Sequence, residues 1–405
     1  MMIIERPDLL ATINAFPKWL FIYGRRKTGK TFLVTRFVPH DEYFFVKSNK
    51  SVFEKDGAEI SLDAFMEILK RGMNEGKTIV IDEFHRLGTS FLDFLHANPG
   101  KGKVILISST LYVSRRMIST HSPLLGLVAE VPVGLITLHD TLRAIVPLPL
   151  PKKERLETAI MAREPIVIEY LDQTRNLEPR ALLANIVLMS KHTIPALTGE
   201  IFSEEERLLS AVYEGIIRAV ASGKVGSGAI SSELFSKRLI KKDDPSIIQQ
   251  YLANLIAFGI LKRIKVFNKN RFVYKIPSPL SRLFYYADEK YNIMERRIPM
   301  QELSTIIEEV MPRIVEDAVR EAIAEKLGLQ ETILEDSDHD VDGCLLAFKK
   351  PAVFIEVKWG RVSKEDVAKA ERNASRISAP RKILFVRDKH ALHTSLEAWD
   401  VDDLA

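Results

Sequence analysis

Residues 24–31 contain the pattern that most constrains the fold of this chain: Gly24, four residues, then Gly29, Lys30 and Thr31. The segment fits G-x-x-x-x-G-K-[ST] without a mismatch, between an apolar run at 19–23 and a segment with helical spacing of apolar residues. The glycines let backbone N–H groups turn inward, and a helix starting there adds the positive end of its dipole. A chance match is the alternative, which the flanking strand and helix disfavour. The sequence therefore predicts a loop that binds phosphate groups.

Each residue of this loop has an expected role. Lys30 would reach the β- and γ-phosphates of a nucleotide, and the hydroxyl of Thr31 would ligate Mg²⁺. The remaining positions would surround the phosphate oxygens: Gly24, Arg25, Arg26, Lys27, Thr28 and Gly29. We therefore expect ATP and Mg²⁺ as cofactors, with Lys30 among the catalytic residues.

A second motif lies about fifty residues on, where the apolar segment 78–84 contains Asp82 and Glu83. Asp82 would hold the Mg²⁺ shell, and Glu83 would polarise the attacking water. An acidic pair often just ends a strand, but the upstream loop strengthens the catalytic interpretation.

The next apolar segment, 103–110, ends in Ser108, Ser109 and Thr110. Ser108 or Ser109 could sense the γ-phosphate, and hydroxyls that cap a following helix explain these residues equally well. No arginine is preferred as the source of positive charge for the transition state. The candidates are Arg115, Arg116 and Arg143.

Strands alternate with helices through the first part of the chain. Strands are predicted for the apolar segments at 19–23, 43–47, 78–84 and 103–110. An amphipathic helix is predicted to begin after Ser61, a plausible N-cap. This alternation predicts an α/β fold with a parallel sheet and crossover helices. Residues 140–200 are predicted to be mostly helical. The length of 405 residues suggests two to four domains.

Residues 204–298 are basic, with 17 Lys/Arg against 10 Asp/Glu, and they carry a different pattern. A helix from Ser203, a helix at 229–236 and a helix from Asp244 precede two β-rich segments joined by Asn268-Lys269-Asn270, a hairpin signal. This order predicts a winged helix-turn-helix. Its DNA contacts would come from the third helix and the hairpin: Gln249, Gln250, Lys262, Arg263, Lys265, Lys269 and Arg271. A winged helix that docks a protein, with solvated charges, is the alternative.

Residues 299–405 are acidic, with 15 Lys/Arg against 22 Asp/Glu. A long helix at 302–327 carries Glu316, and it precedes strands that carry Asp342, Glu356 and Lys358. Alternation sends Glu356 and Lys358 to one face of their strand, so Asp342 and Glu356 could hold Mg²⁺ while Lys358 positions a hydrolytic water. Glu316 would complete the shell. A surface carboxylate–lysine pair explains the same residues without catalysis, and the acidic balance argues against tight DNA binding by this segment alone.

With these motifs in place, the chain resembles the archaeal ATPase branch of the AAA+/STAND group of P-loop NTPases over nearly its whole length. The resemblance implies an ATPase domain at 1–200 with a helical lid at about 140–200, a winged helix at 201–298, and a nuclease-like domain of PD-(D/E)XK type at 299–405. Two departures are visible. Glu5-Arg6 stands where relatives carry Arg-Glu, and Arg163-Glu164-Pro165 stands at the Gly-x-Pro element of the lid.

Composition limits the classes of protein that remain. The hydrophobic fraction of 46% and the charged fraction of 28% are typical of a globular chain, and no apolar run approaches the length of a membrane span. Nothing at the N-terminus predicts export. Cys344 is the single cysteine, which excludes a disulfide framework or a thiolate zinc site within the chain and favours a reducing cytoplasm. Monomer and homo-oligomer both remain open.

Three functional hypotheses follow. The first is an ATPase that binds DNA through its winged helix and delivers a nuclease-like domain to it. The second is a STAND-type signalling switch in which ATP controls a binding surface and the nuclease-like domain is inactive. The third is a transcription regulator whose ATPase is only a sensor.

Overall fold

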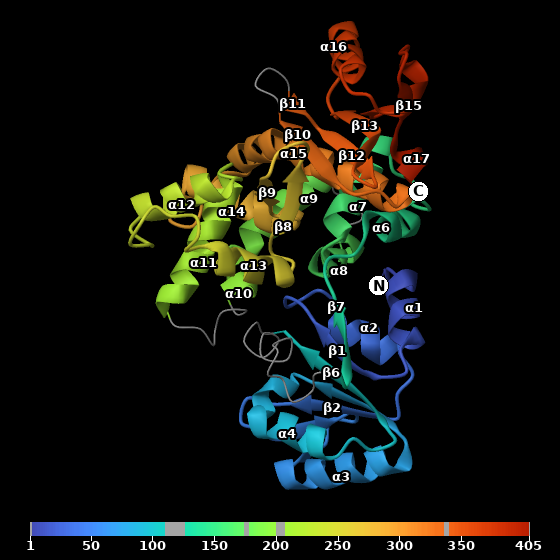
Figure 1. Ribbon diagram of the computed structural model, residues 1–405, viewed down its shortest axis with the longest axis vertical. Helices are drawn as coiled ribbons and strands as arrows, with labels where there is room; N and C mark the ends of the chain where they lie inside the picture. The colour runs from blue at the N-terminus through green and yellow to red at the C-terminus, as the bar shows by residue number, and fades with distance from the viewer. Residues whose placement is uncertain (1, 110–125, 174–177, 200–206, 336–339, 405) are drawn as a thin grey trace.

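The computed structural model describes residues 2–109, 126–173, 178–199, 207–335 and 340–404. Figure 1 shows a lower part, blue to cyan, built around one sheet, and an upper part, green to red, that contains the remaining elements. We call the first the sheet domain, the described residues of 7–133. We call the second the composite body, the described residues from Ile136 to Leu404. No helix in the described ranges combines the length and the hydropathy needed to cross a membrane.

The sheet domain contains a seven-stranded sheet of order β4-β3-β2-β5-β6-β1-β7 within the described residues. Its parallel strands are β1 (Trp19–Tyr23), β2 (Glu42–Val46), β5 (Thr78–Asp82), β6 (Lys103–Ser108) and β7 (Val128–Pro132). All of β1 is buried, as a parallel strand covered by helices on both faces requires. The predicted parallel strands are therefore confirmed. The antiparallel edge of the sheet was not predicted; it consists of β3 (Val52–Glu54) and β4 (Glu59–Ile60).

Helices cover both faces of this sheet and form a separate hydrophobic cluster on each. One face carries α1 (Pro7–Ala15) and α2 (Lys30–Phe37), and the other carries α3 (Leu62–Glu75) and α4 (Thr89–Ala97). A short 3₁₀ helix, η1 (Phe84–Leu87), follows β5. The predicted N-cap of α3 is confirmed, because the Ser61 hydroxyl accepts a hydrogen bond from the Ala64 amide at 3.2 Å.

The composite body begins with the helices predicted for 140–200 and continues into three helices and a hairpin. The first set is α6 (Leu138–Ile145), α7 (Lys152–Ala162), α8 (Pro165–Gln173), α9 (Pro179–Met189) and α10 (Thr193–Gly199). The second is α11 (Arg207–Ala221), α12 (Ser227–Ser236), α13 (Gln249–Ala257), β8 (Lys262–Val266), β9 (Phe272–Lys275) and α14 (Pro279–Tyr291).

The helix α13 begins later than predicted. Residues 245–248 form a turn, in which the Asp244 carboxylate accepts a hydrogen bond from the Ser246 amide at 2.9 Å. The aspartate therefore caps a turn rather than the helix itself.

The last segment contains two further β-structures beside the long predicted helix. Its elements are α15 (Met300–Leu327), β10 (Thr332–Glu335), β11 (Asp340–Val341), β12 (Gly343–Ala347), β13 (Lys350–Lys358), α16 (Lys364–Ser375), β14 (Arg381–Val386), η3 (Lys389–Ala391), β15 (Glu397–Trp399) and α17 (Val401–Leu404). One sheet has the order β12-β13-β14-β15, and the other has the order β11-β10-β8-β9. Since β10 pairs with β8 in parallel, the hairpin and the C-terminal segment share one sheet.

One hydrophobic cluster runs through the whole composite body. It joins residues from the lid helices, the three-helix segment and the C-terminal segment: Ile160, Leu183, Ile216, Leu255, Ile323 and Phe385. The domain boundaries at 200/201 and 298/299 remain predictions from sequence motifs, and both fall within the stretch of chain that contributes to this cluster.

An ion-pair network at the centre of the composite body accompanies that cluster. Asp317 of α15 lies 2.5 Å from the nearest guanidinium nitrogens of both Arg320 and Arg282. Arg320 also pairs with Glu331 at 2.8 Å, and Glu331 pairs with Lys262 of the hairpin at 2.5 Å. These charged groups are paired with one another in the interior of the composite body. Removing one of them would therefore leave a buried charge without a partner of opposite sign.

Candidate functional site

The phosphate-loop backbone depends on glycine at two positions. Gly24 has φ +146° and Gly29 has φ +82°, which are values that favour glycine. A Cβ atom on Gly24 would also lie 2.3 Å from the carbonyl oxygen of Val133, just after β7. The loop therefore packs directly against the end of the neighbouring strand, and only glycine fits at its start.

Lys30, the first residue of α2, is held inside this loop. Its Nζ donates hydrogen bonds to the carbonyl oxygens of Gly24 at 2.9 Å and Arg25 at 2.7 Å. Burial lowers the pKa of Lys30 to about 8, although the charges of Glu83 and Asp82 oppose that shift. The ammonium group is thus enclosed by the loop that would surround phosphate oxygens.

The side chains of Thr31, in the first turn of α2, and Asp82, the last residue of β5, are in contact. The Thr31 hydroxyl donates to Asp82 Oδ2 at 2.5 Å, and the Tyr43 hydroxyl donates to the same oxygen at 3.1 Å. Burial raises the pKa of Asp82, while the hydrogen bond from Thr31 lowers it. A hydroxyl beside a carboxylate suits Mg²⁺, which takes few protein ligands and keeps several waters.

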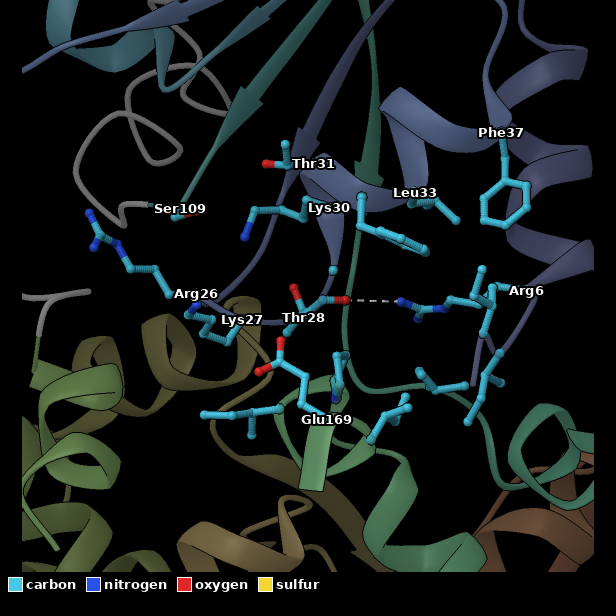
Figure 2. Close-up of a pocket in the computed structure, with 18 of the residues that line it drawn as sticks. Arg6, Arg26, Lys27, Thr28, Lys30, Thr31, Leu33, Phe37, Ser109 and Glu169 are labelled. Atoms are coloured by element: carbon cyan, nitrogen blue, oxygen red, sulfur yellow. Dashed lines mark hydrogen bonds between the residues drawn. The ribbon is translucent and has the colours of Figure 1, made fainter. Parts of the chain in front are cut away.

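The loop opens onto a cavity of about 480 Å³ between the sheet domain and the composite body. Figure 2 shows Lys30, Thr31 and Ser109 on its upper side, with Glu169 of α8 pointing its carboxylate toward the loop from the other side. The composite body contributes apolar side chains to the wall: Ile136, Pro165, Ile166 and Ile168. A cavity with a cationic, backbone-rich side and an apolar side matches the two halves of a nucleotide.

Most of the predicted loop residues line this cavity: Arg26, Lys27, Thr28, Gly29, Lys30 and Thr31. Arg25 does not, because its guanidinium pairs with the buried carboxylate of Glu164 from the composite body. The prediction that Arg25 is one of the phosphate-binding loop positions stays a prediction, and the side chain of Arg25 points away from the cavity toward Glu164. Its backbone carbonyl instead accepts a hydrogen bond from Lys30.

Some of the predicted catalytic and sensor residues line the cavity, and others do not. Glu83 and Ser109 line the cavity, whereas Ser108 is fully buried and lies 3.3 Å from His85 Nδ1. Among the arginine candidates, Arg143 pairs with Asp140 at 3.4 Å and is half exposed. Three of the residues considered above lie outside the described residues: Thr110, Arg115 and Arg116.

Two arginines at the cavity were not among the predicted site residues, although Arg6 belongs to the Glu5-Arg6 pair noted above as a departure from relatives. Arg6 donates hydrogen bonds to the Leu135 carbonyl at 2.9 Å and the Thr28 carbonyl at 3.4 Å, which Figure 2 marks, and burial lowers its pKa to about 10. Arg86 donates to the Val46 carbonyl at 2.7 Å. The sequence offered little signal for either, since each contacts backbone at least 22 residues away in the chain.

The hairpin and third helix place most of the predicted DNA contacts at the surface. The exposed residues of the prediction are Gln249, Gln250, Arg263, Lys265, Lys269 and Arg271. Lys262 is different, because its Nζ pairs with Glu331 at 2.5 Å and Glu321 at 3.2 Å. Strand alternation explains this correction: Lys262 points to the same side as the buried Ile264 and Val266, toward α15.

An additional cationic stretch was not predicted. Arg238, Lys241 and Lys242 are exposed in the connection between α12 and α13. They extend the basic surface beyond the hairpin.

The four predicted nuclease residues come together electrostatically in the C-terminal segment. Lys358 Nζ contacts Glu356 Oε1 at 2.7 Å, and Asp342 Oδ2 accepts a hydrogen bond from the Val357 amide at 2.8 Å. Burial raises the pKa of Glu316, and the neighbouring Asp342 raises it further. Asp342 lies at a bend between β11 and β12 rather than on a strand, where its carbonyl accepts a hydrogen bond from Arg320 at 2.8 Å.

This cluster does not form the metal shell expected from the sequence. Nowhere in the described ranges do three His, Cys, Asp or Glu side chains come together in a group that could hold a metal ion. Glu356 has one oxygen on the Lys358 ammonium, and its other oxygen is buried without a hydrogen-bond partner. The residues of the motif are near one another, but the geometry is that of an ion pair beside buried acids.

Comparison with known proteins gives one family match and several distant structural likenesses. The model of the family described as AAA domain matches residues 17–131. A search of the curated proteins gave no match. The *Aeropyrum pernix* ORC1 protein in complex with DNA is 14% identical with a TM-score of 0.32, and covers 73% of this chain and 95% of its own.

Two further solved structures are similar at the same level. The *Aeropyrum pernix* ORC2 protein has 13% identity, coverages of 77% and 93%, and a TM-score of 0.35. The CDC6P protein from *Pyrobaculum aerophilum* has 14% identity, coverages of 71% and 91%, and a TM-score of 0.25. At these TM-scores the likeness says nothing about what this chain binds. The family match agrees with the phosphate loop and the parallel sheet, so residues 17–131 have the P-loop fold of an AAA domain.

Proposed function

We propose that this protein is a Mg²⁺-dependent ATPase that binds DNA through its three-helix and hairpin segment. The hydrogen bond between Thr31 and Asp82, beside Lys30 and Glu83 at one cavity, is the observation that carries the ATPase part. It brings a phosphate-loop hydroxyl and a strand-end carboxylate together from positions 51 residues apart.

Four residues of the phosphate loop and the end of β5 have roles in the proposed hydrolysis of ATP. Lys30 binds the β- and γ-phosphates, and Thr31 with Asp82 would hold the metal ion. Mg²⁺, when bound, neutralises charge on the phosphate oxygens. Glu83 lines the cavity and orients the attacking water, whose proton it accepts.

The Glu83→Gln variant tests this assignment. The amide keeps the size of the side chain but cannot accept the proton, so we expect kcat to fall by about a hundredfold or more while ATP still binds. Steady-state turnover and a fluorescent ATP analogue measure the two effects. Lys70→Ala, an exposed change on α3, is the control. Turnover by Glu83→Gln at the wild-type rate would refute the assignment.

DNA binding is supported by the order of elements and by charge. Three helices and a hairpin have the order expected of a winged helix-turn-helix, and residues 204–298 are basic, with 17 Lys/Arg against 10 Asp/Glu. Arg263 and Lys265 are exposed on β8, and the exposed cations between α12 and α13 add to this surface. Phosphate contacts of this kind make affinity depend on salt.

A charge reversal separates DNA binding from docking of a protein. We expect Arg263→Glu with Lys265→Glu to weaken duplex binding and to lower the slope of log affinity against log salt by about one to two. Lys350→Glu, an exposed change on β13, is the matched control. Fluorescence anisotropy at several salt concentrations gives the slope. Unchanged affinity and slope in the double variant would remove the hairpin from any DNA interface.

Nuclease activity is a second candidate, because Glu316, Asp342, Glu356 and Lys358 lie in one electrostatic cluster. The ion pair between Lys358 and Glu356 favours the alternative of an ATP-regulated protein with an inactive nuclease-like domain. Incubation of DNA with Mg²⁺ or Mn²⁺ decides between them, with Lys358→Ala beside the wild type. Cleavage that Lys358→Ala abolishes supports the nuclease, and absence of cleavage with intact ATP turnover supports the regulator.

A further inference from the structure

Glu83 occupies an unusual position directly after β5. Its backbone has φ 54° and ψ 33°, a left-handed conformation that is uncommon for a residue with a side chain. Its amide donates to Asp82 Oδ1 at 2.9 Å. Its Oε2 atom is buried without a hydrogen bond that meets normal geometry. A buried carboxylate oxygen without a hydrogen-bond donor costs folding free energy. The groups that surround this oxygen are therefore candidates for a role at the site.

His85, two residues on, lies beside that oxygen. Its Nδ1 lies 3.4 Å from Glu83 Oε2 and 3.3 Å from Ser108 Oγ. The side chain is 4% exposed, and burial together with the charges of Arg86 and Arg26 lowers the pKa of His85 to about 4. The imidazole is therefore neutral at pH 7, with one N–H and one lone pair.

The position of the ring proton follows from the charge on Glu83. A lone pair on Nδ1 would face a carboxylate oxygen and repel it, whereas an N–H at the same atom would attract it. The carboxylate thus favours the tautomer with the proton on Nδ1. Ser108 Oγ competes for the same proton as a second acceptor, since both oxygens lie at nearly equal distance from one nitrogen.

The consequence reaches the cavity. Glu83 lines it, and Ser109, next to Ser108 at the end of β6, lines it on the same side as Lys30 (Figure 2). A fixed His85 would hold the carboxylate at one place on the cavity wall. Arg86 Nη2, 4.0 Å from the same oxygen, is too distant to orient it by a hydrogen bond.

We propose that His85 is a positioning residue, whose Nδ1–H holds the Glu83 carboxylate toward the cavity while Ser108 competes for that proton. This inference rests on the proposed ATPase function. It assigns Ser108 an action on the glutamate through His85, in place of the direct contact with phosphate expected from the sequence.

Substitutions at His85 test the polar contact with Glu83 rather than the packing. His85→Leu keeps much of the volume without a donor, and we expect kcat to fall at least about tenfold while the Kd for ATP stays within about twofold. His85→Asn places an amide near the position of Nδ1 and should recover most of the rate. His85→Gln places its amide near Nε2 and should not. Ser108→Ala should change kcat by no more than about threefold, because His85 still holds Glu83.

The double variant His85→Leu with Glu83→Gln gives the sharpest result. If His85 acts only through Glu83, the double variant turns over no more slowly than Glu83→Gln alone. Thermal unfolding verifies that each variant is folded, and the Asn and Gln variants still discriminate if the Leu variant is not.

The outcomes separate this inference from the proposed function. Wild-type turnover equal to that of Glu83→Gln overturns both. A slow Glu83→Gln variant beside a His85→Leu variant with normal kcat overturns the role of His85 alone. So does a His85→Asn variant as slow as His85→Gln, a Ser108→Ala variant as slow as His85→Leu, or an additive double variant.

Discussion

The sheet domain and the composite body are stabilised in different ways. In the sheet domain, apolar strands pack against helices on both faces, and the two hydrophobic clusters are separated by the sheet. The composite body has one large cluster that joins segments from Ile136 to Leu404, three smaller clusters beside it, and an ion-pair network around Asp317 and Arg320. Figure 1 shows the two parts meeting near β7 and α8.

The difference concerns the distance in sequence between residues that depend on one another. The phosphate loop comes from eight consecutive residues, and its partner Asp82 ends β5, which is separated from β1 by β6 alone. In the composite body, the Trp359 indole donates to Glu157 at 2.9 Å across 202 residues of chain. A motif can therefore specify the first region, whereas the second exists only when distant segments have assembled.

The boundary between the two parts has its own contacts. Arg25 of the phosphate loop pairs with Glu164, which also accepts a hydrogen bond from the Ser278 hydroxyl at the N-cap of α14. Tyr23 at the end of β1 lies 6.3 Å, between ring centroids, from Phe258 at the end of α13. The composite body thus contacts Arg25 of the phosphate loop through Glu164, and Tyr23, just before the loop, through Phe258.

The largest expected effect breaks the network of the composite body. Asp317→Asn removes the negative charge that faces Arg320 and Arg282, so we expect a loss of about 3–5 kcal/mol in the stability of that part. Trp359 reports on the composite body, and Trp19 reports on the sheet domain. Denaturant unfolding of variants that retain one of these tryptophans, with the other tryptophans changed to Phe, measures each part.

Glu295→Gln, an exposed change in the composite body, is the control for this experiment. Equal shifts at Trp19 and Trp359 would contradict the distinction, because the two parts would then unfold as one unit.

A second prediction concerns the sheet domain. Lys30→Ala removes the ammonium enclosed by the loop, and we expect ATP affinity to fall by about a hundredfold, equivalent to about 2.7 kcal/mol. Titration with a fluorescent ATP analogue measures this loss, and Lys70→Ala serves as control. Unfolding at Trp359 should stay unchanged without nucleotide. An unchanged ATP affinity would remove Lys30 from the binding site.

The smallest expected effect lies at the boundary. Glu164→Gln keeps an acceptor for Ser278 but removes the charge that holds Arg25, so we expect ATP affinity to change by about fivefold, close to 1 kcal/mol. Bound ATP should also raise the unfolding midpoint at Trp359 less than in the wild type. Glu178→Gln, exposed before α9, is the comparison. The same response to ATP in both variants would show that this contact does not connect the two parts.

The sequence by itself determined the phosphate loop, the strand that ends at Asp82, and the order of helices and hairpin. These features are local, since glycine conformations, apolar periodicity and capping act over a few residues. The predicted strands at 19–23, 78–84 and 103–110 and the predicted helix at 61–76 correspond for that reason to β1, β5, β6 and α3.

Tertiary structure alone decided the remaining features. It turned Arg25 toward Glu164, brought Arg6 to the Thr28 carbonyl, and paired β10 with the hairpin so that Lys262 faces α15. Each depends on two segments meeting, and burial then makes their charges pair because an unpaired charge in the interior is costly. The motif at residues 24–31 was enough to predict the phosphate loop. The contacts of the loop's side chains depend on the composite body, which packs against the loop.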